Sequence, residues 1–364
     1  MRGGVSVKKL LCGLLCLSMV CTAGCSAMLD RDYSFVTEHS ATPASDGDTN
    51  TLRVKSYQEL VNALIYLINK GSEEGTIRFE EGEEADVKQM MDEACLEVQE
   101  DPLGAYAVDY IKYGVTSIVG SYEAGVSITY RRTREQVAAI VDATGTSAIR
   151  SELSRALATF SDEVVLRISY FEENEAYIQE LVRQAYLSNP ETALSMPQAQ
   201  VAMYPKSGQQ RIVEVLLTYP QSLQVLESQR NSMAREAERL VLPLQDLSVE
   251  RKLSGIVQAL SDAGGYVSGG GSTPYDALFN GGADSQGIAL AMALLCRQAG
   301  ISCVVVDGQW KGQSHCWNVV QTDQGYRHVD LTSTAGVSYQ VDTAMAQLGY
   351  TWDSELVPKC TVEG

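Results

Sequence analysis

An internal duplication with a period of roughly 90 residues constrains the fold of the middle of this chain more than any other feature. A repeat of this size predicts two copies of one small module rather than a single large domain. The aligned pairs are ELVNAL at 59–64 with ELSRAL at 152–157, ADVKQMMDEAC at 85–95 with AYIQELVRQAY at 176–186, and SITYRR at 127–132 with VLLTYP at 215–220.

The apolar spacing predicts the same elements in each copy: a helix, a short strand, a second helix and a further strand region. The short strands are expected at Thr76–Phe79 and Leu166–Phe171, and the later strand regions at Val126–Tyr130 and Val213–Tyr219. Apolar residues of the second helix recur at helical spacing in both copies and therefore face a core. Two α/β modules are expected.

The N-terminus predicts export. Residues 1–9 carry three positive charges, and the apolar run LLCGLLCLSMV that follows is too short to span a membrane but suits a signal peptide. Thr22, Ala23 and Gly24 before Cys25 resemble the lipobox of bacterial lipoproteins, although Thr22 replaces the usual leucine. We expect a lipid on Cys25 and a place on the extracellular face of the cell membrane. A plain secretory signal is the alternative.

Composition argues against several classes of partner and cofactor. The net charge of −18 makes nucleic acid an unlikely match for this surface. Beyond the signal peptide and Cys25 there are five cysteines without CxxC spacing, and the chain has only three histidines, so no metal and no cofactor are predicted. The glycine run at 264–272 is expected to be a loop, and it lacks the GK[ST] ending of a phosphate cradle.

The segment 272–335 carries the side chains on which chemistry depends. An apolar helix is expected to begin near Ser285, and three neighbouring strands are expected at 302–309, 315–321 and 325–331. The turn TDQG folds the last two strands back on each other, so that His315 and Asp330 meet across them. Trp317 is expected to share the face of His315, and Asn318 to point the other way.

This segment resembles the transglutaminase-like superfamily. The resemblance implies a papain-like α+β core, in which a nucleophile begins a helix packed against an antiparallel sheet that presents a histidine and an aspartate. It implies Ser285, His315 and Asp330 at the catalytic positions, with Ser285 standing where the family has a cysteine. The residues that match the family's landmarks are Tyr275, Leu278, Gly287, Ala289, Gly300, Ile301, His315, Trp317, Asn318, Val329, Asp330 and Thr332.

These patterns together predict an α+β protein of several parts. Helices expected at 222–241 and 248–263 separate the duplicated region from the segment that resembles transglutaminases. The predicted order is a signal peptide (1–24), a flexible tether (25–53), repeat modules (54–145 and 146–221), a helical connector (222–271) and a transglutaminase-like domain (272–364).

The serine at position 285 leaves three hypotheses open. A hydroxyl ionises far above the thiol pKa of about 8.5, so catalysis of the cysteine type is expected to be crippled. No neighbouring thiol replaces it, because Cys316 faces the other side of its strand and Cys296 lies roughly 16 Å along the helix. In the first hypothesis the domain binds a peptide, a protein or a cell-wall component without catalysis. In the second it is a serine hydrolase or acyltransferase that acts on peptide or protein amides. In the third the polar residues have only a structural role, because they satisfy one another in the core.

Overall fold

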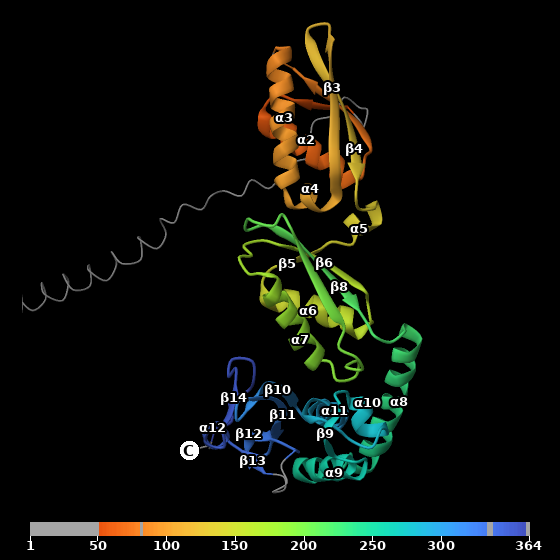
Figure 1. The fold of residues 1–364 in the computed structure, drawn as a ribbon, viewed down its shortest axis with the longest axis vertical. Helices are drawn as coiled ribbons and strands as arrows, with labels where there is room; N and C mark the ends of the chain where they lie inside the picture. The colour runs from red at the N-terminus through yellow and green to blue at the C-terminus, as the bar shows by residue number, and fades with distance from the viewer. Residues whose placement is uncertain (1–50, 81–82, 333–337, 362–364) are drawn as a thin grey trace, which may run out of the picture.

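The computed structural model describes residues 51–80, 83–332 and 338–361, which form three units stacked along the long axis of the molecule (Figure 1). Each unit is built on one sheet, of four, four and five strands in chain order. The predicted signal peptide and Cys25 lie outside the described residues. Within the described ranges, no helix has the length and apolar character needed to cross a membrane.

The first unit packs its helices on one sheet of order β1-β2-β4-β3, in which β1 runs parallel to β2 and the other pairs are antiparallel. The side chain of Ser56 caps the first helix, and Gly71 ends it in the left-handed conformation that glycine adopts without strain. Its elements are β1 (Thr51–Val54), α2 (Tyr57–Lys70), β2 (Glu74–Phe79), α3 (Glu84–Glu100), α4 (Pro102–Ala107), β3 (Val108–Ile118) and β4 (Ser121–Tyr130).

The second unit has the same topology, with sheet order β5-β6-β8-β7 and β5 parallel to β6. A short helix, α5 (Arg134–Ala138), joins it to the first unit. Its elements are β5 (Val141–Ala143), α6 (Thr146–Ala158), β6 (Glu163–Ile168), α7 (Glu175–Leu187), β7 (Gln198–Tyr204) and β8 (Arg211–Thr218).

Two predicted boundaries at the start of these units were wrong. Residues 51–53, assigned to the tether, belong to β1, and residues 141–143, assigned to the first module, form β5 beside β6 of the second unit. Strands of three or four residues show too little alternation to be recognised from sequence, and only their pairing reveals them. The hairpin strands β3 and β7 were also absent from the prediction.

The third unit surrounds a central helix, α11, whose residues from Gly287 to Cys296 are all buried. Its sheet has the order β13-β12-β11-β10-β14 and is antiparallel throughout. The elements are α8 (Leu223–Val241), η1 (Leu242–Leu244), α9 (Val249–Asp262), β9 (Tyr266–Gly271), α10 (Pro274–Phe279), α11 (Ser285–Gln298), β10 (Cys303–Trp310), β11 (Gln313–Thr322), β12 (Gly325–Val329), β13 (Tyr339–Gln340), α12 (Asp342–Gln347) and β14 (Tyr350–Trp352).

The helices predicted as a connector are part of this unit. Met233 of α8 and Ile256 of α9 lie in one apolar core with Leu295 of α11. The segment predicted as a glycine loop is the strand β9, and Gly271 at its end makes a β-bridge with Ala283. A Cβ at Gly271 would collide with the side chain of Asp276, so glycine is required by close packing rather than by a ligand.

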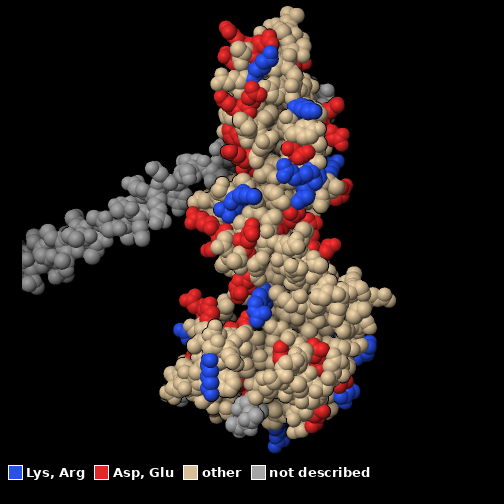
Figure 2. All heavy atoms as spheres, viewed as in Figure 1, with Lys and Arg blue, Asp and Glu red and all other residues tan. Residues whose placement is uncertain are grey.

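Apolar cores and ion pairs join the three units. Val165 and Ile212 of the second unit lie in the core of the first, and Leu290 of α11 lies in the core of the second. An ion pair between Arg132 and Glu214, at 2.8 Å, supports the first of these junctions. Acidic side chains, with some basic ones among them, are spread over the upper two units, and the visible face of the third carries scattered charges of both signs (Figure 2).

Truncating Leu290 to alanine should destabilise the third unit, because its side chain is fully buried between two units. The free energy of unfolding is expected to fall by about 2–5 kcal/mol, as for other buried leucines. All three tryptophans lie in the third unit, so their fluorescence during denaturation in urea reports on it. Leu348→Ala, at a half-exposed position, is the control and should change stability by less than about 0.5 kcal/mol.

Candidate functional site

The N-terminus of α11 is held by a set of hydrogen bonds around Asp284. One carboxylate oxygen of Asp284 accepts from the backbone N–H of Gly287 at 2.9 Å, and the other accepts from the hydroxyl of Ser272. Ser285 is the first residue of the helix. Among the described residues, none accepts from the backbone N–H of Ser285 or Gln286. This end of the helix therefore presents free donors and partial positive charge.

The hydroxyl of Ser285 contacts β11 at the point where β12 has ended. Its Oγ accepts a hydrogen bond from the backbone N–H of Cys316 at 3.4 Å. Asn318 pairs with Val329, the last residue of β12, so the N–H of Cys316 on the same side of β11 has no strand partner. The half-buried Ser285 occupies that position.

His315 and Asp330 meet as the turn between β11 and β12 predicts. The distance from His315 Nε2 to Asp330 Oδ2 is 2.8 Å. Tyr350 donates its hydroxyl to the same oxygen at 2.6 Å, and the backbone N–H of Thr332 donates to the other oxygen at 2.9 Å. Burial opposes ionisation of Asp330, but the hydrogen bonds from His315, Tyr350 and Thr332 outweigh it and lower the pKa of this carboxyl.

Aromatic rings cover the imidazole of His315, which is only 9% exposed. Trp317 stacks beside it at 6.2 Å between ring centroids, and Trp310 and Tyr350 lie at 5.9 and 6.0 Å. Since Nε2 faces Asp330, Nδ1 is the nitrogen left for a reacting group. Within the described ranges, no hydrogen bond joins that nitrogen to Ser285.

Asn318 faces away from His315, as alternation along a strand requires. Its side-chain amide donates to the backbone carbonyl of Ala289 in α11 at 2.9 Å. This hydrogen bond between β11 and α11 fixes where the helix lies along the sheet, and it thereby fixes the position of Ser285. The contact of Tyr350 with Asp330 was not predicted, because the two residues are 20 apart and no local pattern links them.

A second pair of histidine and aspartate lies behind Trp317. The indole N–H of Trp317 donates to His328 Nδ1 at 2.9 Å, and His328 Nε2 lies 2.9 Å from Asp342 Oδ1. An indole nitrogen only donates, so Nδ1 must accept and Nε2 must carry the proton. His328, Asp342 and Cys360 place potential ligand atoms within 4.8 Å of one another, but a protonated Nε2 cannot bind a metal ion, and this donor set does not fit one.

The cysteines of the third unit do not supply a thiol to Ser285 or His315. Cys316 is buried with its Sγ 3.6 Å from Asp307 Oδ1, and burial together with that carboxylate raises the pKa of its thiol to about 12. Hydrogen bonding with Cys303, together with burial, raises the pKa of the Cys296 thiol well above its ordinary value. These thiols are inert as nucleophiles at neutral pH.

The second unit reaches the residue next to Ser285. Arg183 of α7 forms a two-pronged ion pair with Asp307 of β10, with Nη2 2.8 Å from Oδ1. A further nitrogen of Arg183 lies 3.4 Å from the side-chain oxygen of Gln286. The start of α11 is thus supported from outside the third unit.

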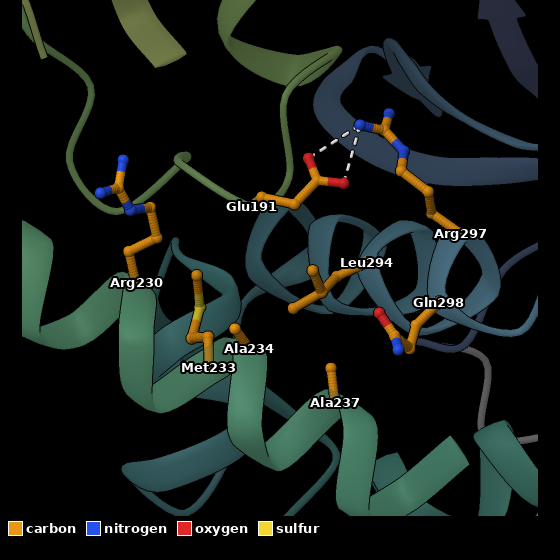
Figure 3. Close-up of a pocket in the computed structure, with 8 residues that line it drawn as sticks. All are labelled: Glu191, Arg230, Met233, Ala234, Ala237, Leu294, Arg297 and Gln298. Atoms are coloured by element: carbon orange, nitrogen blue, oxygen red, sulfur yellow. Dashed lines mark hydrogen bonds and ion pairs between the residues drawn. The ribbon is translucent and has the colours of Figure 1, made fainter. Parts of the chain in front are cut away.

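A small cavity of about 120 Å³ lies between α8 and α11, away from Ser285 (Figure 3). Its floor is apolar, and Arg297 at its mouth is paired with both oxygens of Glu191. The guanidinium of Arg230 donates to the carbonyl of Ala158. The cavity therefore offers packing space without reactive chemistry.

Comparison with known proteins supports a transglutaminase-like domain. Residues 239–331 match the Transglutaminase-like superfamily. Among solved structures, this chain is similar to a TGase crystal structure, with 13% identity and a TM-score of 0.26, over 52% of this chain and 58% of that one. It is also similar to a protein from Parabacteroides distasonis described as a candidate protease, with 11% identity and a TM-score of 0.20, over 70% of this chain and 39% of that one.

The chain thus spans less than two thirds of the length of either solved structure. No protein of curated function matches it. The conclusion that follows is one about class: this is a mixed α/β chain whose third unit contains a transglutaminase-like domain. The match begins inside α8, in agreement with the packing of that helix against α11.

The buried His328 should make stability fall on acidification. Burial lowers the pKa of His328 below its ordinary 6.5, although Asp342 opposes the shift. Below pH 6.5 the unfolded chain therefore binds a proton that the folded chain excludes, and the stability present above that pH is lost as the pH falls. Unfolding in urea at a series of pH values should show this slope. The slope should be smaller in His328→Gln, and an equal slope in both proteins would contradict the assignment.

Proposed function

We propose that this chain is an exported lipoprotein, anchored through Cys25 on the outer face of the cell membrane, whose transglutaminase-like domain binds a peptide, protein or cell-wall component without turning it over. The polar composition of residues 26–50 suits a tether between lipid and folded units. We also propose that the first two units are copies of one module. Their shared sheet order and the aligned sequence pairs support this part of the proposal.

The observation that carries the binding function is the environment of the Ser285 hydroxyl. Its Oγ accepts from the Cys316 N–H, and no described side chain hydrogen-bonds to it as a base. A serine needs such a base, because its own pKa is far too high for it to ionise at a helix N-terminus. In the transglutaminase-like families a cysteine holds this position, and its thiolate would not need the same help. A serine at this position therefore leaves His315 and Asp330 without an activated nucleophile beside them.

A serine hydrolase or acyltransferase acting on peptide or protein amides is the second candidate. The hydrogen bonds that hold His315 through Asp330 favour it, because they leave Nδ1 of the imidazole unpartnered among the described residues. The free N–H groups of Ser285 and Gln286 would also suit an oxyanion. Rotation of the Ser285 side chain toward His315 would complete a triad of the general kind that operates on other folds.

A fluorophosphonate probe distinguishes the two functions. Under the binding proposal, intact-mass measurement of the folded full chain should show no adduct at Ser285, because no base activates its hydroxyl. A stoichiometric adduct that is lost in both Ser285→Ala and His315→Ala would contradict the proposal and establish an activated serine. His328→Gln is the matched control, since it alters a neighbouring histidine that does not face Ser285.

Replacing Ser285 with cysteine should give a reactive nucleophile if His315 and the N-terminus of α11 have a catalytic geometry. The thiol would lie at the helix N-terminus near His315, where its pKa is lowered. We expect iodoacetamide to alkylate position 285 at least about tenfold faster than the buried native cysteines, with peptide mass analysis locating the label. His315→Ala in the same background should slow the reaction. An inert thiol at 285 would instead favour a purely structural role for His315 and Asp330.

A further inference from the structure

A cavity of about 260 Å³ separates the second unit from the third and is distinct from the site at Ser285. One wall is formed by α6 and α7, another by β10, and the rim by the segment after β14. Figure 2 shows the surface hollowed between the middle and lower units, with both acidic and basic side chains on the visible rim. The volume is several times the roughly 30 Å³ that a water molecule occupies in the liquid, so this space holds more than isolated waters.

The β10 wall is a sheet edge that lacks a partner strand. Gln321 donates its N–H to the carbonyl of Ser302, and hydrogen-bonded pairs alternate in an antiparallel ladder, so even-numbered residues of β10 face β11. Odd-numbered residues face the opposite side, where β14 covers only Gly308–Trp310. The backbone groups of Val305 therefore point toward the cavity, and none of the described residues hydrogen-bonds to them, whereas Asp307 lies opposite Asp353 at the end of the pairing with β14.

The opposite wall also carries unpaired polar atoms. Nε of Arg150 and Oε1 of Gln184 are buried and have no hydrogen-bond partner among the described residues. The amide nitrogen of Gln184 donates to Glu180 at 3.1 Å, which orients the side chain and leaves its oxygen as an acceptor. The β10 wall thus offers a backbone donor and acceptor, whereas the unpaired atoms of Arg150 and Gln184 have almost no accessible surface and would pair with a ligand only after a movement of their side chains.

An extended peptide matches this arrangement. Successive residues of a strand present their N–H and C=O groups to opposite sides, so one residue pairs with β10 while the next faces Arg150 and Gln184. Strand addition to an exposed sheet edge is a recurring mode of peptide recognition. The apolar lining from Leu187, Leu356 and Val357 would contact the side chains of the peptide.

The charged residues that line the cavity favour a basic peptide. Asp307 is neutralised by Arg183, which leaves Glu180 and Asp353 against the single cation Arg150. The whole chain carries a net charge of −18 and attracts cations over a longer range. We propose that this cavity binds a basic, extended segment of a partner protein as an added strand on β10, independently of the state of Ser285.

The test uses the peptide acetyl-(Lys-Val)4-amide and the full chain in detergent, with binding measured by calorimetry. We expect saturable binding, weaker binding of (Glu-Val)4, and loss of about tenfold in affinity when alternate peptide nitrogens are methylated, since each lost hydrogen bond costs on the order of 1 kcal/mol. Amide hydrogen exchange should slow at Val305. Methylation changes the peptide and not the protein, so this part of the test does not require any protein variant to fold.

Variants locate the peptide on the protein. Val305→Pro removes the outward N–H without touching the ladder to β11 and should weaken binding about tenfold, whereas Val305→Ala keeps the N–H and should bind better than the proline variant. Glu180→Gln should weaken binding, and Glu175→Gln, at an exposed position on the same helix, should not.

Three results would overturn the proposal. One is absence of binding to the full chain. Another is binding that Val305→Pro and Glu180→Gln leave unchanged, with protection at a different strand edge. The third is binding seen only in a chain that begins at residue 51, which would show that the chain's own N-terminal segment, rather than a basic partner, fills the cavity.

Discussion

The burial of α11 is the constraint on which the third unit depends. Ten consecutive residues of this helix have no exposed face, so helices pack on one side, the sheet on another and the second unit at Leu290. A helix enclosed in this way cannot slide, and its first turn is fixed further by Asp284 and by the bond from Asn318 to Ala289. The position of Ser285 is therefore set by packing and not by any ligand.

Asp330 organises the polar part of the site. A buried carboxylate is costly unless it is hydrogen-bonded, and here one oxygen accepts from Tyr350 and faces His315 while the other accepts from Thr332. Each of these groups comes from a different part of the chain, so the carboxylate also ties β11 to β14. His315 and Asp330 therefore have a structural role as well, since removing either would leave a buried polar partner unsatisfied. The same hydrogen bonds that stabilise the fold also hold His315 in one orientation.

The sequence was most informative where spacing alone determines geometry. The helix at Ser285, the three strands after it and the meeting of His315 with Asp330 follow from alternation and from one short turn. Contacts made by residues far apart in the chain could not be foreseen. Tyr350 reaches Asp330 only because β14 pairs with β10, and Arg183 reaches Gln286 only because two units dock. Short strands such as β5 were missed for the same reason, since their partners define them.

The contacts of Arg183 connect the cavity on β10 with the site on α11. Arg183 binds Asp307, whose carboxylate lies beside the thiol of Cys316, and the backbone N–H of Cys316 donates to Ser285. Arg183 also reaches Gln286, the residue next to Ser285. The docking of the second unit thus supports both the outer side of β10 and the start of α11.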